Sequence, residues 1–519
     1  MVETGTSGVL HGPALPAAMF WGSIVTGRPP SSHGIVGELE VRPDRGGVQP
    51  VSARSWRATP VWRILATEGV ATAVIGWPAT APAATWQGCV VDDRFARPAG
   101  SLTEDWPLPP DCIAPKRLRA VLRGLRVHPE ELDDSATGSL PPALLAAAAS
   151  VHAAATHIAE HEPWRFLTVY YGLLAQVGGD LAWRFQDAML GRLLALAGPD
   201  TDAIVVSPGG VLVAAGPGFA ADVIVHGAGV ADIVPTVLAR FGLSQAGGAG
   251  RTLEGTKCGD LRRVVAPPMP TPSPGDAPPA SPAAAPLIAD VEYRALLHLG
   301  SAALAAGDHA AAAGSFEAVL ALRPDDFDAR FQLGQCRFFL GDWPGCLELG
   351  RALAEAVPAS PWGPMMVGAA LALGGDALAA APHLRAASRL AGRNPAAHVR
   401  LGAVAMHLGR FRDAEAHYAQ ALAIDPRSAD ARAGFGLARL ALGDASGAEA
   451  SLRASLGLQH HAPALHHQLG LLFAAQRRWP EAAAALRVAL AQHPDLADAA
   501  TLLRRVETEL AATAGHAGA

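Results

Sequence analysis

The sequence predicts two folded parts of different class, an α/β domain followed by an all-α array of helical repeats. Residues 12–255 alternate short apolar runs with amphipathic stretches, a pattern typical of strands and helices in turn. Residues 266–288 hold a proline at almost every second or third position, which favours an extended spacer. Beyond them a glycine recurs every 34 residues, which indicates an internal repeat. We therefore divide the chain into domains 1–265 and 289–511, joined by the linker 266–288.

The composition indicates a folded protein without a nucleic-acid partner. Of the 519 residues, 50% are hydrophobic and 17% charged, so the chain has enough apolar material to bury a core. Lys and Arg number 41 against 47 Asp and Glu, a net charge of −6 without a basic block, which argues against binding to DNA or RNA. The five cysteines form no C-x-x-C pair, so neither a disulfide framework nor a thiolate zinc site is predicted.

No targeting or membrane segment is predicted. The first residues show no basic segment followed by an apolar one, so we expect a cytoplasmic protein. The uncharged stretches 139–159 and 203–221 consist of small residues interrupted by proline, and their weak hydrophobicity predicts no membrane span. A membrane partner is therefore not expected.

The first domain is predicted to hold a largely parallel sheet, because helical stretches separate its strand-like runs. Apolar runs predict strands at 70–76, 166–172, 203–207 and 211–216. Amphipathic spacing predicts helices at 60–68, 115–126, 142–160, 180–197 and 231–241. The glycine-rich segment 216–229 is interpreted as a loop between two strands.

Five segments of this domain, in this order, carry a resemblance to a known family. They are SIVTGRPPSSHGIVG (23–37), VIGWPATAPA (74–83), GCVVDDRF (88–95), DAMLGRLLALAGPDTDAIVVS (187–207) and GAGVADIVPTVLARFGL (227–243). Together they resemble the alkaline-phosphatase superfamily, in its type I phosphodiesterase / nucleotide pyrophosphatase branch. The resemblance implies an alkaline-phosphatase-like parallel sheet and two metal ions, usually zinc, that three Asp and three His hold beside a Thr or Ser nucleophile.

The family's site residues are not matched in this sequence. No strand ending in the family's Asp-containing loop is recognised before SGVLHGPALPAAMFW, so we expect a truncated sheet that is less stable than the repeats. Ala17 or a neighbour stands at the nucleophile position, and Ala175 and Gly179 stand at an Asp and a His position. Pro208-Gly209 replaces a second such pair, and the loop of the last His is deleted. The resemblance therefore implies no catalytic residue, no metal ligand and no cofactor here, with two zinc or manganese ions as the alternative.

Other polar residues of this domain are assigned structural roles. His33 and His226 survive near the family's site, but single histidines of this kind are expected to be hydrogen-bonded residues of the fold. Asp92, Asp93 and Arg94 are expected to form ion pairs in a loop. None of the five is predicted to take part in chemistry.

Two histidine motifs have a metal-binding alternative. The residues 157–161 spell H-x-x-E-H, which on a helix could bind zinc as in a metalloprotease. The stretch around them is rich in alanine, so we prefer to interpret them as the polar face of an amphipathic helix. The pairs His460-His461 and His466-His467 are assigned to a turn between repeats and the helix after it. With two lysines in the chain and no G-x-x-x-x-G-K-[ST], a phosphate-binding P-loop is excluded.

The repeat segment has a fixed internal pattern. Its glycines stand at 300, 334, 368, 402, 436 and 470, a small residue follows twelve positions later, and a large one usually stands four beyond that. The segment resembles a tetratricopeptide repeat (TPR) array of six units over 293–496, with a final helix near 497–511. Gly350 replaces the large residue of the second unit, and Gly392 and His460 replace the proline that closes other units, so looser junctions are expected there.

The first helix of each unit is expected to line a concave groove that binds a protein or peptide partner. The groove residues are Arg294, His298, Phe331, Gln332, Gln335, Trp362, Met365, Met366, Arg400, His467 and Gln468. This surface is apolar in the middle and basic at its edges, which suits an extended or helical segment with apolar anchors and a carboxylate. We expect a non-catalytic scaffold; the alternative is a metal-dependent phosphoric-ester hydrolase with a repeat domain that targets or regulates it.

Overall fold

The chain forms two compact units, Met1–Leu299 and Gly300–Ala519, and each is described by itself. The structure is a computed structural model. It describes residues 5–11, 16–42, 46–83, 86–97, 107–132, 140–177, 179–207, 210–245, 250–269, 285–459, 462–493 and 496–517. The division falls inside helix α10 (Ala285–Ala305), and most of the predicted linker lies outside the described residues. Ala266 and Met269, at its start, pack against the core of the first unit.

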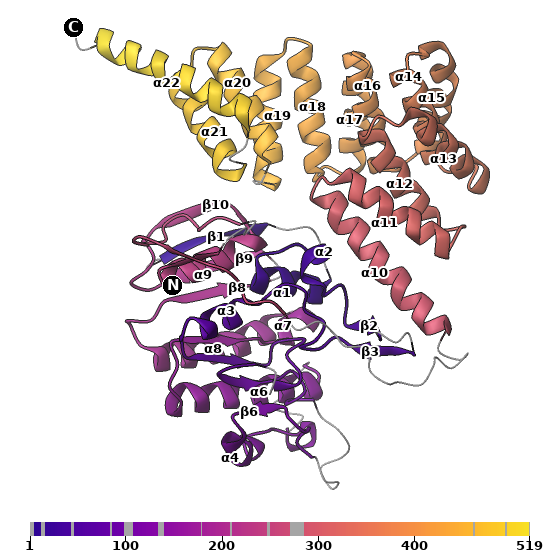
Figure 1. Cartoon of the computed structure of the whole chain (residues 1–519). Helices are drawn as coiled ribbons and strands as arrows, with labels where there is room; N and C mark the ends of the chain where they lie inside the picture. The colour runs from indigo at the N-terminus through magenta and orange to yellow at the C-terminus, as the bar shows by residue number, and fades with distance from the viewer. Residues whose placement is uncertain are drawn as a thin grey trace. The chain divides into compact units, whose positions relative to one another are not determined.

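The first unit is an α/β fold with mixed sheets, coloured indigo to magenta in Figure 1. Its strands are β1 Gly5–His11, β2 Leu39–Val41, β3 Val48–Pro50, β4 Thr72–Ile75, β5 Cys89–Val91, β6 Ile113–Ala114, β7 Phe166–Val169, β8 Ala203–Val206, β9 Val211–Ala215, β10 Val223–Gly229, β11 Leu243–Gln245 and β12 Arg262–Val264. Within the described residues, two four-stranded sheets run in the orders β10-β1-β9-β8 and β6-β5-β4-β7. Each contains parallel and antiparallel pairs, so the predicted class is confirmed but the sheets are less parallel than expected.

Strand β1 corrects the expectation of a truncated sheet. It lies between β10, to which it is parallel, and β9, to which it is antiparallel. Ser7 pairs with Ile224 on one side and with Val213 on the other. The central strand that we expected to be missing is therefore present. The reason given for a less stable first domain no longer applies. Strand β10 is a second correction, because its residues were interpreted as part of a loop.

The helices of the first unit follow the sequence pattern more closely. They are α1 Ala17–Thr26, α2 Pro30–His33, α3 Val61–Thr67, α4 Arg119–Arg123, α6 Pro142–His161, α7 Leu173–Gln176, α8 Asp180–Ala197 and α9 Ile233–Arg240, with short 3-10 turns η2 Lys116–Leu118, η3 Pro129–Glu131 and η4 Val230–Asp232. All five predicted helices are found within a few residues of their expected bounds.

Two hydrophobic cores lie on the two faces of the β4 sheet. Val74 faces the larger core, which also holds Leu10 of β1, whereas Ile75 faces the other. Helix α6 covers the second core with Val151 and Ile158. Among the described residues α6 is also the one helix long and apolar enough to cross a membrane by length and composition, and 44% of its apolar window is buried inside this unit.

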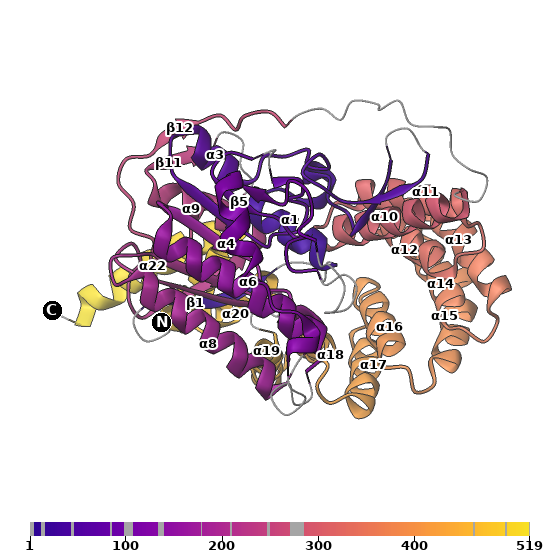
Figure 2. The ribbon, with the colours of Figure 1, turned by 90° about the horizontal axis from the view of Figure 1, so that it is seen from below.

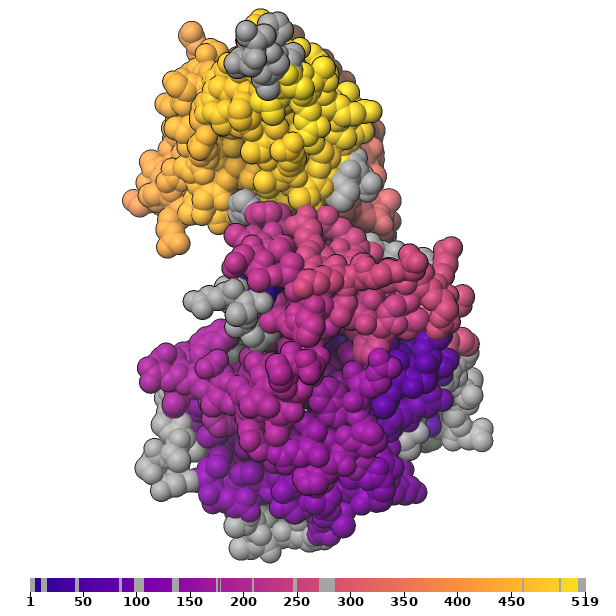
Figure 3. Space-filling model, turned by 90° about the vertical axis from the view of Figure 1, so that its left-hand side faces the viewer, coloured from indigo at the N-terminus to yellow at the C-terminus, as the bar shows by residue number. Residues whose placement is uncertain are grey.

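The second unit is a run of antiparallel helices, coloured red to yellow in Figures 1 and 2. They are α11 His309–Leu322, α12 Phe327–Phe339, α13 Trp343–Ala356, α14 Trp362–Leu373, α15 Ala377–Ala391, α16 Pro395–His407, α17 Phe411–Ile424, α18 Ala429–Ala441, α19 Ala445–Leu458, α20 Pro463–Ala475, α21 Trp479–Gln492 and α22 Ala497–Ala517, preceded by α10. The last helix runs beyond its predicted end at 511. In Figure 3 the yellow residues of the last helices cover this end of the array.

Close approach of two helices explains the repeated glycine. A Cβ atom added at Gly402 would lie 2.8 Å from the ring of Tyr418, and one at Gly470 would lie 2.6 Å from Leu486. Carbon atoms do not approach this closely, so only glycine lets the large side chain of the second helix cross the first. The glycine and the large residue sixteen positions later are thus in contact where the two helices of a hairpin cross.

The turn inside each hairpin is also set by sequence. Gly341 adopts φ +74° and Asp342, which follows it, accepts a hydrogen bond from the N–H of Gly345 (3.0 Å). A glycine in the left-handed region ends the first helix, and the aspartate caps the second. The same left-handed turn recurs in all six units, but in the last one Arg477 occupies it with φ +58°.

The three unusual junctions behave differently from one another. A Cβ atom at Gly350 would lie 3.0 Å from the backbone nitrogen of Val367, and the side chain of Met366 fills the space over Gly334. The expectation of a looser junction at Gly350 is therefore wrong, because the next repeat supplies the missing side chain. The expectation of looser packing holds at Gly392, because α15 packs only lightly on α16. Helix α19 likewise packs only lightly on α20. His460 itself lies outside the described residues.

Candidate functional site

The positions that the resemblance assigns to the family's nucleophile and metal ligands fall at strand and helix ends of the first unit. Strand β1 ends at His11, and helix α1 starts at Ala17, whose side chain is exposed. Gly179 precedes α8 and carries no side chain, while Pro208-Gly209 lies outside the described residues, as do the side chains of His11 and Ala175. In the part of the chain that the structure describes, no three His, Cys, Asp or Glu side chains gather as a metal site.

Strands β8 and β9 form a tight hairpin where the family has its last ligand loop. The backbone N–H of Ser207 donates to the carbonyl of Val211 (3.0 Å), and the N–H of Gly210 donates to that of Ser207 (3.0 Å). The deletion of the family's last ligand loop, inferred from the sequence, stays a prediction.

Aromatic side chains pack together at the ends of β4, β7 and in α1. The ring of Trp21 lies 5.8 Å from that of Trp77 and 5.2 Å from that of Tyr170, and Trp77 lies 5.7 Å from Tyr170. Trp62 extends the cluster by contacting Trp77 at 5.8 Å. Burial raises the pKa of Tyr170, which keeps its hydroxyl neutral. Sequence analysis missed this cluster, because its four members come from four separate segments of the chain.

His33 is a buried structural residue, in agreement with its prediction. Its Nε2 lies 3.2 Å from the hydroxyl of Ser23, and its Nδ1 accepts the backbone N–H of Ile35 at 3.1 Å. Burial lowers the pKa of His33 to about 4. Both ring nitrogens are already used inside the fold, so this residue offers no electron pair to a metal. His226 lies on β10, where its carbonyl accepts a hydrogen bond from Arg251 (3.0 Å).

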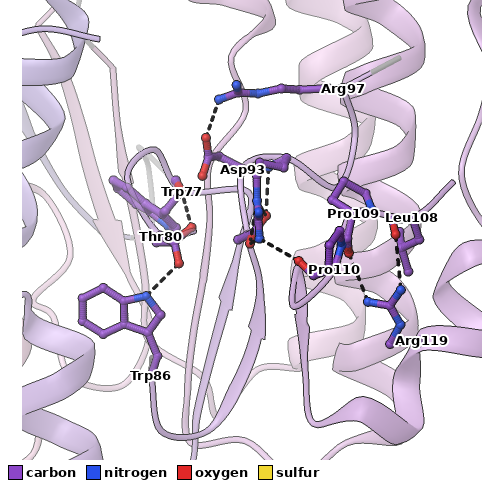
Figure 4. A network of polar contacts seen from close by, with 11 residues as sticks. Trp77, Thr80, Trp86, Asp93, Arg97, Leu108, Pro109, Pro110 and Arg119 are labelled. Atoms are coloured by element: carbon purple, nitrogen blue, oxygen red, sulfur yellow. Dashed lines mark hydrogen bonds and ion pairs between the residues drawn. The ribbon is translucent and has the colours of Figure 1, made fainter. Parts of the chain in front are cut away.

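The acidic loop after β5 is held by ion pairs, as predicted (Figure 4). Arg94 approaches Asp92 at 2.6 Å, and Arg97 pairs with Asp93. Burial raises the pKa of Asp92 and Asp93, while these arginines oppose the shift. Figure 4 also shows that the indole N–H of Trp86 donates to the carbonyl of Thr80, at 2.9 Å. The loop is therefore a structural element.

The H-x-x-E-H motif lies on the outer part of α6. The rings of His157 and His161 stack at 4.4 Å, and Glu160 pairs with Arg192 of α8 at 2.7 Å. The glutamate that a metalloprotease would use as a base is thus engaged in an ion pair between two helices. The geometry favours the interpretation of a polar helix face.

Five of the predicted groove residues are brought together in the array. Phe331 of α12 lies 5.0 Å from Trp362 of α14, ring to ring. Arg400 of α16 donates to the amide oxygen of Gln335 at 3.0 Å, and Gln335 lies 3.4 Å from Gln332. The ring contact thus joins α12 to α14, and the hydrogen bond of Arg400 joins α12 to α16.

The other predicted groove residues are less accessible or lie apart. Met365 and Met366 are only 5% and 8% exposed, so they offer a ligand almost no surface as the helices are packed. Arg294 pairs with Asp290 at 2.9 Å, and His298 lies 3.1 Å from the carbonyl of Val36, inside the first unit. His467 and Gln468 lie half-buried on α20. This helix belongs to the sixth repeat, three repeats beyond α14, which carries Trp362.

A shallow cavity lies where α19 packs lightly on α20. It measures about 520 Å³ and is lined by Arg453, Leu456, Gly457, His466, Leu469, Phe473, Glu481, Ala484, Ala485 and Val488. Sequence analysis did not anticipate it. In the sequence, this cavity could have been anticipated from His460, which stands where a proline closes other repeats.

Two kinds of family model match separate parts of the chain. Residues 1–212 match the model of type I phosphodiesterase / nucleotide pyrophosphatase. Tetratricopeptide repeat models match residues 288–361, 395–428 and 433–497. The first match begins at residue 1 and so includes strand β1. No curated protein matches the chain.

Several solved structures are similar to part of the chain. The APC/C hetero-tetramer Cut9-Hcn1 is 20% identical with a TM-score of 0.35, over 41% of this chain and 42% of that one. A thermophilic TPR protein of Thermus thermophilus is 27% identical with a TM-score of 0.27, over 42% of this chain and 98% of that one. MamA is 21% identical with a TM-score of 0.24, over 33% and 92%.

Proposed function

We propose that this chain, which joins a phosphodiesterase-like region to tetratricopeptide repeats, is an interaction scaffold whose phosphodiesterase-like unit is not catalytic. The observation that carries the proposal is the set of residues at the family's site. By the resemblance, Ala17 or a neighbour stands at the nucleophile position, and Ala175, Gly179 and Pro208-Gly209 stand at four ligand positions. None of these side chains can attack phosphorus or donate an electron pair to a cation.

The residues present do not fit a pair of metal ions. Two-metal hydrolysis requires carboxylates and imidazoles on both cations, and among the described residues no such cluster forms. We therefore assign no cofactor and derive no reaction step. One observation favours the alternative of a working hydrolase with two zinc or manganese ions. His11, a residue type that binds zinc, ends strand β1, near the place of the family's first ligand.

The array is proposed to bind a protein or peptide partner at the groove of the second to fourth repeats. Phe331 and Trp362 supply apolar rings, Gln332 and Gln335 supply amides, and Arg400 supplies a positive charge. Such a surface suits an extended or helical segment that carries an apolar anchor next to a carboxylate. Nucleic acid is a poor partner for a chain of net charge −6. We further propose a cytoplasmic location without membrane binding.

The test is capture of partners by the immobilised full-length protein from cytosolic extract, with quantification by mass spectrometry. Arg400→Ala removes the groove's charge, and Arg412→Ala is the matched control, since Arg412 is an exposed arginine on the second helix of the same repeat. We expect a defined partner whose recovery falls at least tenfold with Arg400→Ala and is unchanged with Arg412→Ala. Equal recovery with both variants, or no defined partner, would contradict the proposal.

A further inference from the structure

Two histidines lie side by side inside the fourth repeat. His398 is on α16 and His417 on α17, and their rings lie 5.8 Å apart with 27° between the ring planes. His398 is only 5% exposed, and His417 is half-buried. No other repeat carries histidine at both positions, where the pairs are Leu296/Ser315, Arg330/Leu349, Pro364/His383, Arg432/Ser451 and His466/Ala485. The general packing of the hairpin therefore does not require this pair.

Hydrogen bonding shows which nitrogen of His398 carries the proton. Its Nε2 lies 3.0 Å from the carbonyl oxygen of Gly392. A carbonyl only accepts, so Nε2 carries the proton of the neutral ring and Nδ1 keeps the free electron pair. Among the described residues, the Nδ1 atoms of His398 and His417 are both buried and have no hydrogen-bond partner. Protonation of the His398 Nδ1 therefore creates a buried N–H without an acceptor, on a charged ring beside a second imidazole.

The hydrogen bond of His398 also fixes the connection between the third and fourth repeats. Gly392 stands where a proline closes other repeats and adopts φ +51°, and His398 ties its carbonyl to α16. Helix α15 packs only lightly on α16. The buried apolar residues of this junction are mostly small: Met365, Ala387, Ala391, Ala397 and Leu401. Little apolar area therefore opposes separation of the two repeats once the hydrogen bond is broken.

The charges around His417 set the direction of the pH effect. Burial lowers the pKa of His417 from its usual 6.5, and the charges of His398 and Arg410 act in the same direction. Asp413 and a hydrogen bond to Gln420 oppose the shift, but Asp413 is itself paired with Arg410. On the adjacent α18, the charge of Asp430 acts on Tyr418, the next residue after His417.

Because its pKa is lowered in the fold, His417 is protonated more readily in the unfolded chain. The stability that the neutral ring provides is therefore present above about pH 6.5 and is lost as pH falls below that value. The loss falls on the fourth repeat, next to the lightly packed junction of α15 and α16.

We propose that the His398–His417 pair is an acid-sensitive switch that opens the junction between the third and fourth repeats. Protonation drives the two rings apart and breaks the hydrogen bond to the Gly392 carbonyl, so that α16 separates from α15. Helix α16 also carries Arg400, which donates to Gln335 of α12 at 3.0 Å, and opening withdraws this charge from the groove. Weaker partner binding in acid rests on the groove proposed above, whereas the opening itself does not.

The test measures hydrogen exchange of the full-length chain by mass spectrometry at pH 7.5 and 5.0, with rates corrected for the intrinsic pH dependence of exchange. We expect the protection of residues 391–403 to be lower at pH 5.0 by about fivefold or more. Protection of α12 and α13, which hold no histidine, should change by less than about twofold. The measurement needs no partner, so a failure of the groove proposal leaves its result unaffected.

Two variants remove the titrating groups. His417→Ser introduces the residue that the next repeat carries at this position, Ser451, and His398→Gln keeps a donor for the Gly392 carbonyl without a titratable ring. In both variants the protection of residues 391–403 should differ by less than about twofold between the two pH values. Comparison within each variant removes any constant loss of stability that the substitution causes.

His383→Ser is the matched control, because His383 occupies the same repeat position on α15 and is exposed. This variant should keep the full pH dependence of the wild type. The proposal would be overturned by a wild-type junction whose protection does not change with pH, or by equal falls in the wild type and both variants. An equal fall in α12 and α13 would also overturn it, because acid would then loosen the array as a whole.

Discussion

Contacting residues in the two units lie at different distances along the chain. In the first unit, Ser7 near the start pairs with Ile224 near the end, and the sheet closes only when both are in place. In the array each helix packs mainly against the next one along the chain. Long-range pairing makes the first unit sensitive to a single displaced strand, whereas nearest-neighbour packing confines damage to one or two repeats.

The largest expected effect breaks the pairing of β1. A Cβ atom at Gly8 would lie 2.7 Å from the carbonyl of Val225, so Gly8→Val must push β1 away from β10. We expect a loss of about 3 kcal/mol or more in the unfolding free energy of the first unit. Hydrogen exchange, read by mass spectrometry, should rise throughout residues 5–245 and remain unchanged in the array. Ser7→Val, on the half-exposed side of the same strand, should be tolerated.

The second prediction concerns pH. Burial lowers the pKa of His33 to about 4 from 6.5, so between these values the unfolded chain binds a proton there that the folded chain does not. The free energy of unfolding should therefore decrease as pH falls from about 6.5 to 4, by about 3 kcal/mol for this residue alone.

The buried carboxyls Asp92 and Asp232, with raised pKa values, act in the opposite direction. The measurement is therefore the difference in pH slope between wild type and His33→Gln in urea unfolding of the full chain. Equal slopes would show that His33 is protonated in the fold and would contradict its assignment as a neutral structural residue.

A smaller effect should stay inside the array. In Gly402→Ala the added methyl group meets the ring of Tyr418 at 2.8 Å, which should destabilise the fourth repeat by about 2 kcal/mol. Gly457→Ala is the control, because nothing lies within 4 Å of its Cβ position and alanine favours the helix by about 1 kcal/mol. Exchange protection of α16 and α17 should fall with the first variant and not with the second. A change of similar size in the first unit would refute the separation of the two units.

The smallest predicted change is a gain. Arg477 adopts the left-handed conformation that glycine adopts in the five other hairpin turns. Arg477→Gly should therefore stabilise the sixth repeat by about 1 kcal/mol. The midpoint of thermal unfolding, followed at the array by exchange, should rise slightly. A lower midpoint would mean that the arginine side chain contributes more than its backbone strain costs.

Sequence patterns predicted local elements better than distant pairings. Helices α6 and α8 follow from their periodicity, and the hairpins of the array follow from a glycine and its large partner within one unit. Strand β1 was missed because GTSGVLH holds few large apolar residues, and β10 because its glycines indicate turns. Strands β1 and β10 are extended because they pair with neighbouring strands in the sheet, and their own composition does not predict this.

The candidate sites show the same limit. The loss of the family's ligands stays a prediction from the sequence, since each position depends on one residue at a known place in a motif. The contact of Trp21 with Trp77 and Tyr170 joins three segments, and no periodicity connects them. The close packing at Gly350 was predicted wrongly for a related reason, because Met366 of the next repeat fills the space over Gly334.

The most direct test of the central claim is the metal content and phosphoesterase activity of the full-length protein, purified without chelators. Zinc and manganese are measured by mass spectrometry, and turnover of bis(p-nitrophenyl) phosphate is followed with either metal added. We predict far less than one ion per chain and no turnover that a chelator abolishes. About two ions per chain together with chelator-sensitive turnover, lost in His11→Ala, would contradict a non-catalytic first unit and establish the hydrolase alternative.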